Sequence, residues 1–99
     1  MERLTREGIA LYKRNILKQI KNAEVIIKVH QGEPVMVSVF IPCEDSITDL
    51  LDSLAKYQTY CELDGKMSEL GTDVIFSGHI IINMRSNREL KAFDVGFLE

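Results

Sequence analysis

Four side chains of this 99-residue chain are of the types that ligate metals or act as nucleophile and base. They are His30, Cys43, Cys61 and His79. Structural zinc sites usually take their ligands in close pairs, because one turn of chain can then aim two ligands at the ion. The gaps here run from 13 to 18 residues. We therefore expect no metal site, and histidines that lie on strand surfaces.

Catalysis by a thiol is a second possibility. Cys43 precedes a predicted helix, whose N-terminus would favour the thiolate, and His79 could be the base if its strand passed nearby. Glu44 and Asp45 adjoin Cys43, however, and would oppose a negatively charged sulfur. We interpret both cysteines as free thiols that fill apolar space. A small enzyme or ligand-binding domain with a site around Cys43 and His79 is kept as an alternative.

Other enzyme signatures are missing from the sequence. It contains neither a Walker-type loop nor a G-x-G-x-x-G pattern, so the common nucleotide enzymes are not indicated. Acidic residues gather near the start of the second predicted helix, where they would stabilise its positive end without any catalytic role. We therefore expect a non-enzymatic protein with no catalytic residue and no cofactor.

Positive charge is concentrated in the first 22 residues. Six basic and two acidic side chains give this segment a charge of +4, which leaves −7 for residues 23–99 of a chain with net charge −3. A basic helix can neutralise phosphates, so a nucleic-acid-binding protein that uses residues 5–22 is one alternative, although a pI near 5.4 is low for that class. Otherwise the cations either face the acidic body or steer an acidic partner. The candidate contacts are Lys13, Arg14, Lys18 and Lys21.

Apolar spacings of three and four predict two helices. The first covers residues 5–22, with Thr5 placed to cap its start. The second covers residues 46–57, where Ser46 and Asp49 resemble a capping box. The apolar stripe of the first helix consists of Ile9, Tyr12, Ile16 and Ile20.

Alternation of apolar and polar residues predicts the strands. Residues 24–30 and 35–41 are rich in β-branched side chains and are joined by a turn with a glycine, which predicts a β-hairpin. Pro42 is expected to end the second of these strands, because proline cannot donate to the ladder. The longest alternation, over residues 73–85, predicts a strand with one face on a core. A last strand is expected over residues 89–98.

Residues 58–72 give the weakest pattern. Asp64-Gly65 is a turn signal, and residues 66–70 fit either a short strand or one helical turn. Strands in adjacent runs indicate an α+β fold with a mainly antiparallel sheet. We therefore expect one α+β domain over residues 1–99, with four or five strands, two helices on one side, and the order α-β-β-α-(β)-β-β.

Composition predicts a globular protein in the cytoplasm. Apolar residues make up 45% of the chain and charged residues 27%, as in ordinary globular domains. No apolar run reaches 18 residues, and no apolar segment follows the basic residues at the start. We therefore expect neither a membrane span nor a secretory signal, and no membrane partner.

The strands carry more apolar side chains than two short helices can cover. Uncovered apolar surface commonly marks an interface. We therefore expect a small interaction or regulatory protein, which binds another protein or a second copy of itself through apolar strand residues and the basic first helix. The candidate strand contacts are Phe40, Ile75, Ile81, Phe93 and Phe97.

Overall fold

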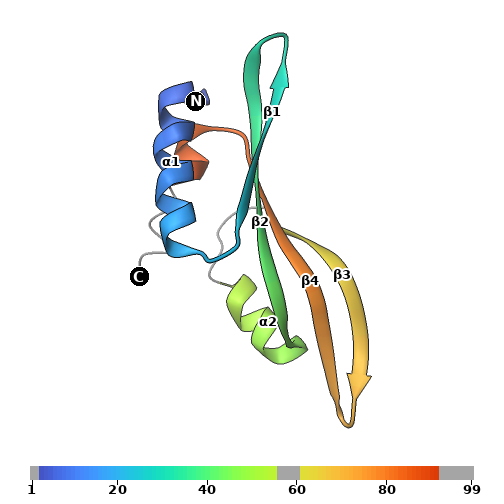
Figure 1. Ribbon diagram of the computed structural model, residues 1–99. Helices are drawn as coiled ribbons and strands as arrows, with labels where there is room; N and C mark the ends of the chain where they lie inside the picture. Colours follow the sequence, from blue (N-terminus) through green and yellow to red (C-terminus); the bar gives the residue numbers. More distant parts are fainter. Residues whose placement is uncertain (1–2, 56–60, 92–99) are drawn as a thin grey trace.

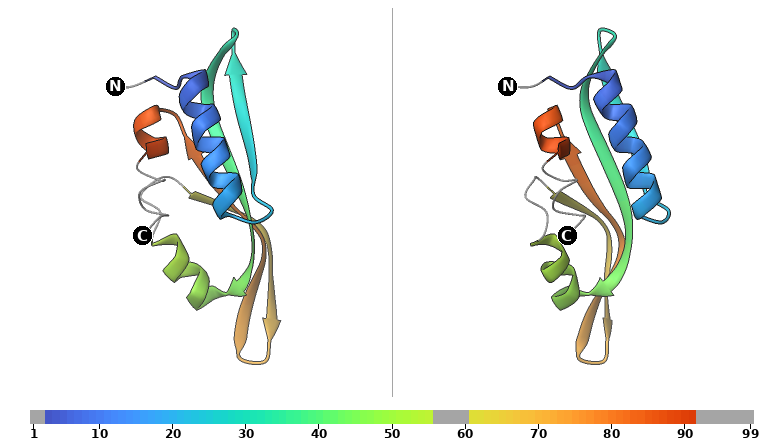
Figure 2. Two further views of the ribbon diagram at one scale, coloured as in Figure 1. Left: turned by 60° about the vertical axis from the view of Figure 1, so that its left-hand side comes forward. Right: turned by 90° about the vertical axis from the view of Figure 1, so that its left-hand side faces the viewer.

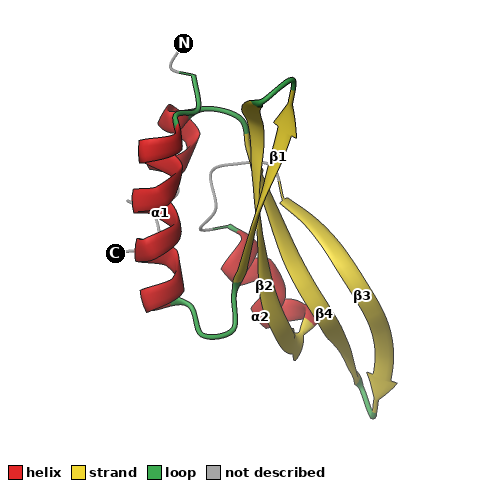
Figure 3. Cartoon of the chain, turned by 45° about the horizontal axis from the view of Figure 1, so that its top comes forward, coloured by secondary structure: helices red, strands yellow, loops and turns green. Residues whose placement is uncertain are grey.

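The computed structural model describes residues 3–55 and 61–91. Figure 1 labels its elements in chain order: α1 (Arg6–Gln19), β1 (Glu24–His30), β2 (Glu33–Ser46), α2 (Ile47–Leu54), β3 (Cys61–Leu70) and β4 (Asp73–Met84). The four strands form one antiparallel sheet in the order β1-β2-β4-β3. Both helices lie on the same side of it (Figures 1 and 3), which confirms the predicted α+β fold.

Helix α1 begins as the sequence predicts. The backbone N–H of Gly8 donates to Oγ1 of Thr5 at 3.0 Å, so Thr5 caps the first turn. The helix buries its apolar stripe and ends at Gln19, before the predicted end at residue 22. Asn22 has a φ of 64°, a left-handed conformation that turns the chain out of the helix and toward β1.

The first hairpin is confirmed, but Pro42 does not end its second strand. Strand β2 runs 14 residues to Ser46 and pairs with β4 as far as Ser46↔Ile75. Its pairing with β1 stops at Phe40↔Glu24, so beyond Phe40 one side of β2 has no β1 residue beside it. A proline is tolerated on such an edge, because its missing N–H leaves no ladder bond unmade.

Helix α2 starts where the capping pattern places it. The N–H of Asp49 donates to Oγ of Ser46 at 3.3 Å, and the helix spans Ile47–Leu54. Residues 56 and 57 of the predicted helix lie outside the described residues. Leu50, only 1% exposed, anchors α2 in the core.

The turn predicted at Asp64-Gly65 is wrong, because β3 passes straight through it. Gly65 faces Gly78 across the β3–β4 pair, and a Cβ on either glycine would collide with the backbone of the opposite strand. Glycine at both positions therefore lets the two strand backbones approach closely, because neither residue has a side chain in the way. The turn lies at Gly71, whose φ of 65° favours glycine.

The strand predicted over residues 89–98 is wrong at its start, because residues 87–91 are helical. Ser86 caps this short helix, since its Oγ accepts from the N–H of Glu89 at 3.2 Å. The Glu89 carboxylate in turn accepts from the N–H of Arg85. This reciprocal arrangement resembles a capping box, a signal present in the sequence that the strand prediction overlooked. Residues 92–98 lie outside the described residues, so a fifth strand is not shown.

The core lies between the helices and one face of the sheet. Strand residues of one parity point into it, as the alternation of β2 and β4 predicts. Val37, Val39, Ile82 and Met84 are fully buried there beneath α1. The sheet is long, and the β3–β4 hairpin extends beyond α2 (Figure 2). The principal extents of 49 × 29 × 24 Å describe the resulting elongated shape.

Candidate functional site

The sheet face that turns away from both helices is the strongest candidate surface, and we call it the open face. In Figures 1 and 3 no described helix lies over it. The residues that alternate with the core residues along each strand point to this face, as the strand pairing shows. Its apolar and central polar members are Ile26, Met36, Ser38, Phe40, Ile75, Ile81 and Asn83.

Apolar side chains form the middle of the open face. Phe40 and Ile81 are direct partners across β2 and β4, and both are half-buried. Ile26 lies on β1 two pairs along the ladder, at the next position on this face, and is 50% exposed. Met36 is also half-buried and continues the band along β2, whereas the half-buried Ile75 lies on the same face of β4 but is separated from Ile81 by the exposed residues Ser77 and His79. The predicted contacts Phe40, Ile75 and Ile81 therefore share one surface.

A buried polar pair lies within this apolar band. Oγ of Ser38 donates to Oδ1 of Asn83 at 2.6 Å, and each residue is only 8% exposed. Register sets the two opposite each other, with Ile26 on the other side of Ser38. The pair is buried although no described helix lies over it. A satisfied polar pair at the centre of an apolar surface favours one fixed arrangement of the surrounding side chains.

Charged residues surround the apolar band. Glu24 is the β1 partner of Phe40, and Glu62 is the β3 partner of Ile81, so an acidic residue stands at each end of that row. His79 packs its ring edge against Phe40, with ring centroids 6.4 Å apart.

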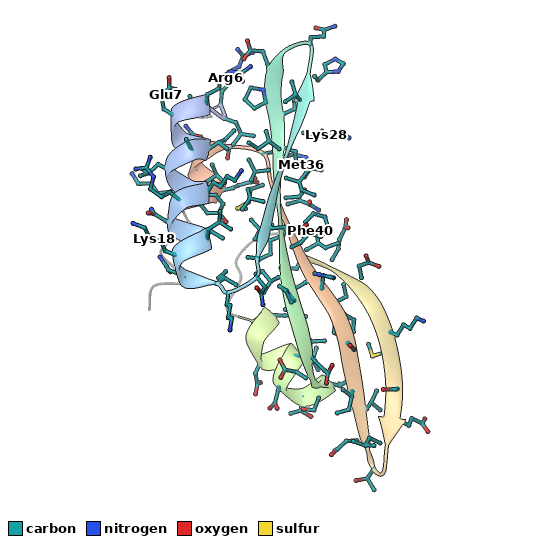
Figure 4. All side chains as sticks on the ribbon, in the orientation of Figure 1. Arg6, Glu7, Lys18, Lys28, Met36 and Phe40 are labelled. Carbon is teal, nitrogen blue, oxygen red and sulfur yellow. The ribbon has the colours of Figure 1, made fainter. Side chains whose placement is uncertain are left out.

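The basic helix lies on the opposite side of the molecule. Lys13, Arg14, Lys18 and Lys21 are all exposed, and α1 packs on the core face. Figure 4 shows Lys18 on the outer side of α1, whereas Met36 and Phe40 lie on the side of the sheet away from it. The structure thus does not bring together the two halves of the predicted site. Phe93 and Phe97, the remaining predicted contacts, lie outside the described residues.

Sequence reasoning missed an apolar groove between α1 and the β1–β2 hairpin, with a volume of about 310 Å³. Two cations stand in its lining, and Arg6 is held there by donating from Nη2 to the carbonyl oxygen of Gly32 at 2.6 Å. The groove is formed only by the packing of the helix against the hairpin, so no local sequence pattern predicts it. It is lined by Arg6, Ile9, Ala10, Lys13, Ile27, Val29 and Pro34.

The proposed thiol site is not assembled. Cys43 pairs with Gly78 on the core face, whereas His79 lies on the open face opposite Pro42, so the imidazole cannot reach the sulfur. Burial, followed by the hydrogen bond to Asp45 and the negative charge of Asp45, raises the pKa of Cys43 to about 11. The Cys43 thiol is therefore protonated at neutral pH and is a poor nucleophile.

Cys43 and Cys61 are both free thiols packed against the core, as the sequence predicts. Burial also raises the pKa of Cys61. Across residues 3–55 and 61–91, no group of three or more histidine, cysteine or acidic side chains is arranged to hold a metal ion.

Neither a protein family model, nor a curated protein, nor a solved structure matches this chain. The described helices are all too short or too polar to cross a membrane. The function is therefore inferred from the open face and from the basic helix α1.

Proposed function

We propose that this protein is a non-enzymatic interaction or regulatory module that binds a partner protein on its open face. The observation that carries the proposal is the apolar band around Phe40 and Ile81, left uncovered by the described helices and held around a buried polar pair. Contiguous apolar surface of this kind commonly marks an interface. Half-buried side chains already held in place lose little conformational freedom when a partner covers them.

The charges around the band indicate the chemistry of the partner. Glu24 and Glu62 bracket the Phe40–Ile81 row, and Asp64 lies two pairs further along β3, on the same face. An apolar patch with basic residues at its rim would complement this surface, because opposite charges favour encounter and orientation. The cations of α1 lie on the other side of the sheet and take no part in this contact.

Site-specific photo-crosslinking tests the proposal. A photoreactive amino acid is placed at Ile26 or Ile81 on the open face, and at Leu51 on α2 as a matched position, since Leu51 is an apolar residue that is 60% exposed. We expect a discrete crosslinked partner from the two open-face positions and none from Leu51. Mass spectrometry of the crosslinked band identifies the partner.

A pair of charge variants completes this test. Phe40→Glu should abolish the crosslink from Ile81, because it puts a carboxylate in the centre of the contact. Leu51→Glu adds the same charge elsewhere and should leave the crosslink intact. Thermal unfolding of both variants shows that they are folded. Equal crosslinking from Leu51, or an unchanged crosslink in Phe40→Glu, would falsify the proposal.

Nucleic-acid binding by α1 is the second candidate, and the arrangement of its cations favours it. Within the described part of the chain no acidic side chain lies within ion-pairing distance of Lys13, Arg14, Lys18 or Lys21, so these charges are available to phosphates. Acidic residues gather instead toward α2 and the β3–β4 hairpin, away from α1 (Figure 1). A phosphate surface could thus approach α1 from its outer side.

A salt titration with duplex and single-stranded oligonucleotides tests this second function. Binding that weakens steeply with salt, and that Lys13→Glu/Lys18→Glu removes, would support it. Lys28→Glu is the control, because Lys28 lies on β1 on the side of the sheet away from α1 (Figure 4). The absence of binding at low salt excludes this function.

A further inference from the structure

Among the described strands, β3 is a regular edge of the sheet, with a strand on one side only. It pairs with β4 from Cys61↔Ile82 to Leu70↔Asp73 without any shift in register, and no described strand lies on its other side. Its ten residues contain no proline and no bulge. Natural edge strands usually carry such features, because a regular edge offers its N–H and C=O groups to another chain.

The opposite edge of the sheet differs. Strand β1 has an irregularity in its pairing with β2 between Lys28 and Val29, which disturbs the edge near its end. It is also shorter, with seven residues. Of the two edges, β3 is therefore the one suited to extend the sheet.

The residues of β3 are self-complementary about Gly65. In an antiparallel pair related by a two-fold axis at Gly65, each residue faces the one equally far from Gly65 in the second copy. Asp64 then lies opposite Lys66 of the second copy, and the same contact occurs twice. On the other face Leu63 lies opposite Met67 of the second copy, also twice. Glu62 lies opposite Ser68.

Neighbouring registers are much less favourable. Residues that lie directly opposite each other in an antiparallel pair point to the same face of the sheet. The two-fold axis must therefore lie between two copies of the same residue. An axis at Asp64 or at Lys66 sets that residue against itself, and like charges directly opposite each other are destabilising. An axis at Leu63 sets Glu62 against Asp64. Gly65 is the axis that opposes no like charges and forms two ion pairs.

The exposed apolar residues of β3 fit the same arrangement. Leu63 is 42% exposed and Met67 is 55% exposed in the single chain. The β3–β4 hairpin extends beyond α2, which leaves its outer part without a covering helix (Figure 2). Edge pairing would bring Leu63 of each copy against Met67 of the other copy, and would reduce the area of both side chains that contacts water.

We propose that β3 pairs with β3 of a second copy of this chain, antiparallel and with Gly65 on the two-fold axis, so that the two sheets become continuous. This contact runs along the edge of β3 rather than across the Phe40–Ile81 row, and although Glu62 and Asp64 border both, the inference goes beyond the proposed function and does not depend on it. Seven facing residues per copy make a small interface, so we expect a reversible dimer whose population rises with concentration.

Charge variants at two positions test this register by sedimentation equilibrium from micromolar to millimolar concentration. Asp64→Lys and Lys66→Asp each replace two attractive contacts by two repulsive ones, and each should weaken self-association by about tenfold or more. An equimolar mixture of the two variants restores both attractions, and should form a heterodimer about as strong as the wild-type dimer. Asp64→Lys/Lys66→Asp in one chain should restore the homodimer.

Glu62→Lys is the matched control. It changes the charge by the same amount as Asp64→Lys on the same strand, but its partner in the pair is Ser68. It should dimerise like the wild type, and mixing it with Lys66→Asp should give no heterodimer of wild-type strength. Circular dichroism and thermal unfolding confirm that all variants are folded.

Three results would overturn the inference. One is a wild-type chain that stays monomeric at every concentration. Another is a mixture of Asp64→Lys and Lys66→Asp that fails to associate while the wild type dimerises. A third is a Glu62→Lys variant as defective as Asp64→Lys. Phe40→Glu leaves β3 unchanged and should dimerise normally, so this test and that of the open face fail independently.

Discussion

The two faces of the sheet are made of alternate residues of the same strands, yet their surroundings differ sharply. Ile82 on the core face is fully buried beneath α1, whereas its neighbour Ile81 on the open face is only half-buried. Both are isoleucines with the same strand propensity. The comparison teaches that apolar character places a residue in a strand, but that the position of the helices decides whether it stabilises the fold or remains available to a partner.

The largest expected effect comes from truncating these two isoleucines. Ile82→Ala should lower the free energy of unfolding by about 2–5 kcal/mol, because it leaves a cavity in a closed core. Ile81→Ala removes the same atoms from a half-exposed position and should cost less than about 1.5 kcal/mol. Urea denaturation of the two variants measures the difference. Equal losses would mean that the open face is covered in solution, which would contradict the contrast between the faces.

A smaller effect is expected at the polar pair within the open face. Asn83→Ala leaves the buried hydroxyl of Ser38 without this acceptor and should cost about 1–3 kcal/mol. Ser38→Ala leaves the buried Oδ1 of Asn83 without this donor and should carry a loss of similar size.

A double-mutant cycle sharpens this second prediction. The two substitutions should be non-additive by about 1 kcal/mol, because each removes the same hydrogen bond. Additive losses in urea denaturation would show that the Ser38–Asn83 contact does not help to hold the open face in shape.

The smallest effect concerns Cys43 on the core face. Its folded-state pKa of about 11 lies above the ordinary 9.0, so the folded chain holds the proton more tightly than the unfolded chain. The contribution of the Cys43 thiol to the free energy of unfolding is therefore fully present below pH 9 and is lost as the pH rises through 11. In a Cys61→Ser variant, alkylation at pH 8 should be slower for the folded protein than for the same chain in urea.

Asp45→Asn serves as the control for this third prediction. It removes the negative charge that raises the thiol pKa but leaves the burial, which is the larger cause. Alkylation should become moderately faster without reaching the rate of the unfolded chain. A folded thiol that reacts as fast as the unfolded one would show that Cys43 is not sheltered on the core face.

Much of the fold could be predicted because its signals are local. The apolar stripe of α1, the cap at Thr5 and the alternation in β2 and β4 each depend on residues close together in sequence. At residues 89–91 the strand prediction is wrong, because the capping pattern of Ser86 and Glu89 starts a helix there. The turn predicted at Gly65 is wrong because the cross-strand residue that explains this glycine, Gly78, is distant in sequence.

The candidate site could be predicted only in part. Phe40, Ile75 and Ile81 were selected from alternation, and register does place them on one face. The cations of α1 were joined to them in one predicted surface, although the helix packs on the other side of the sheet. Which side of a sheet a helix covers depends on contacts between distant segments, and no local pattern specifies it.

The amino-acid sequence by itself determined which residues form helices and strands and which of them share a face, because periodicity is a local property of the backbone. It also determined the charge difference between the first helix and the rest of the chain. Only the tertiary structure decided that the cations and the apolar band lie on opposite sides, and that β3 is an edge with no described strand on its outer side. These features depend on strand order and helix packing, which are set by contacts between residues far apart in the chain.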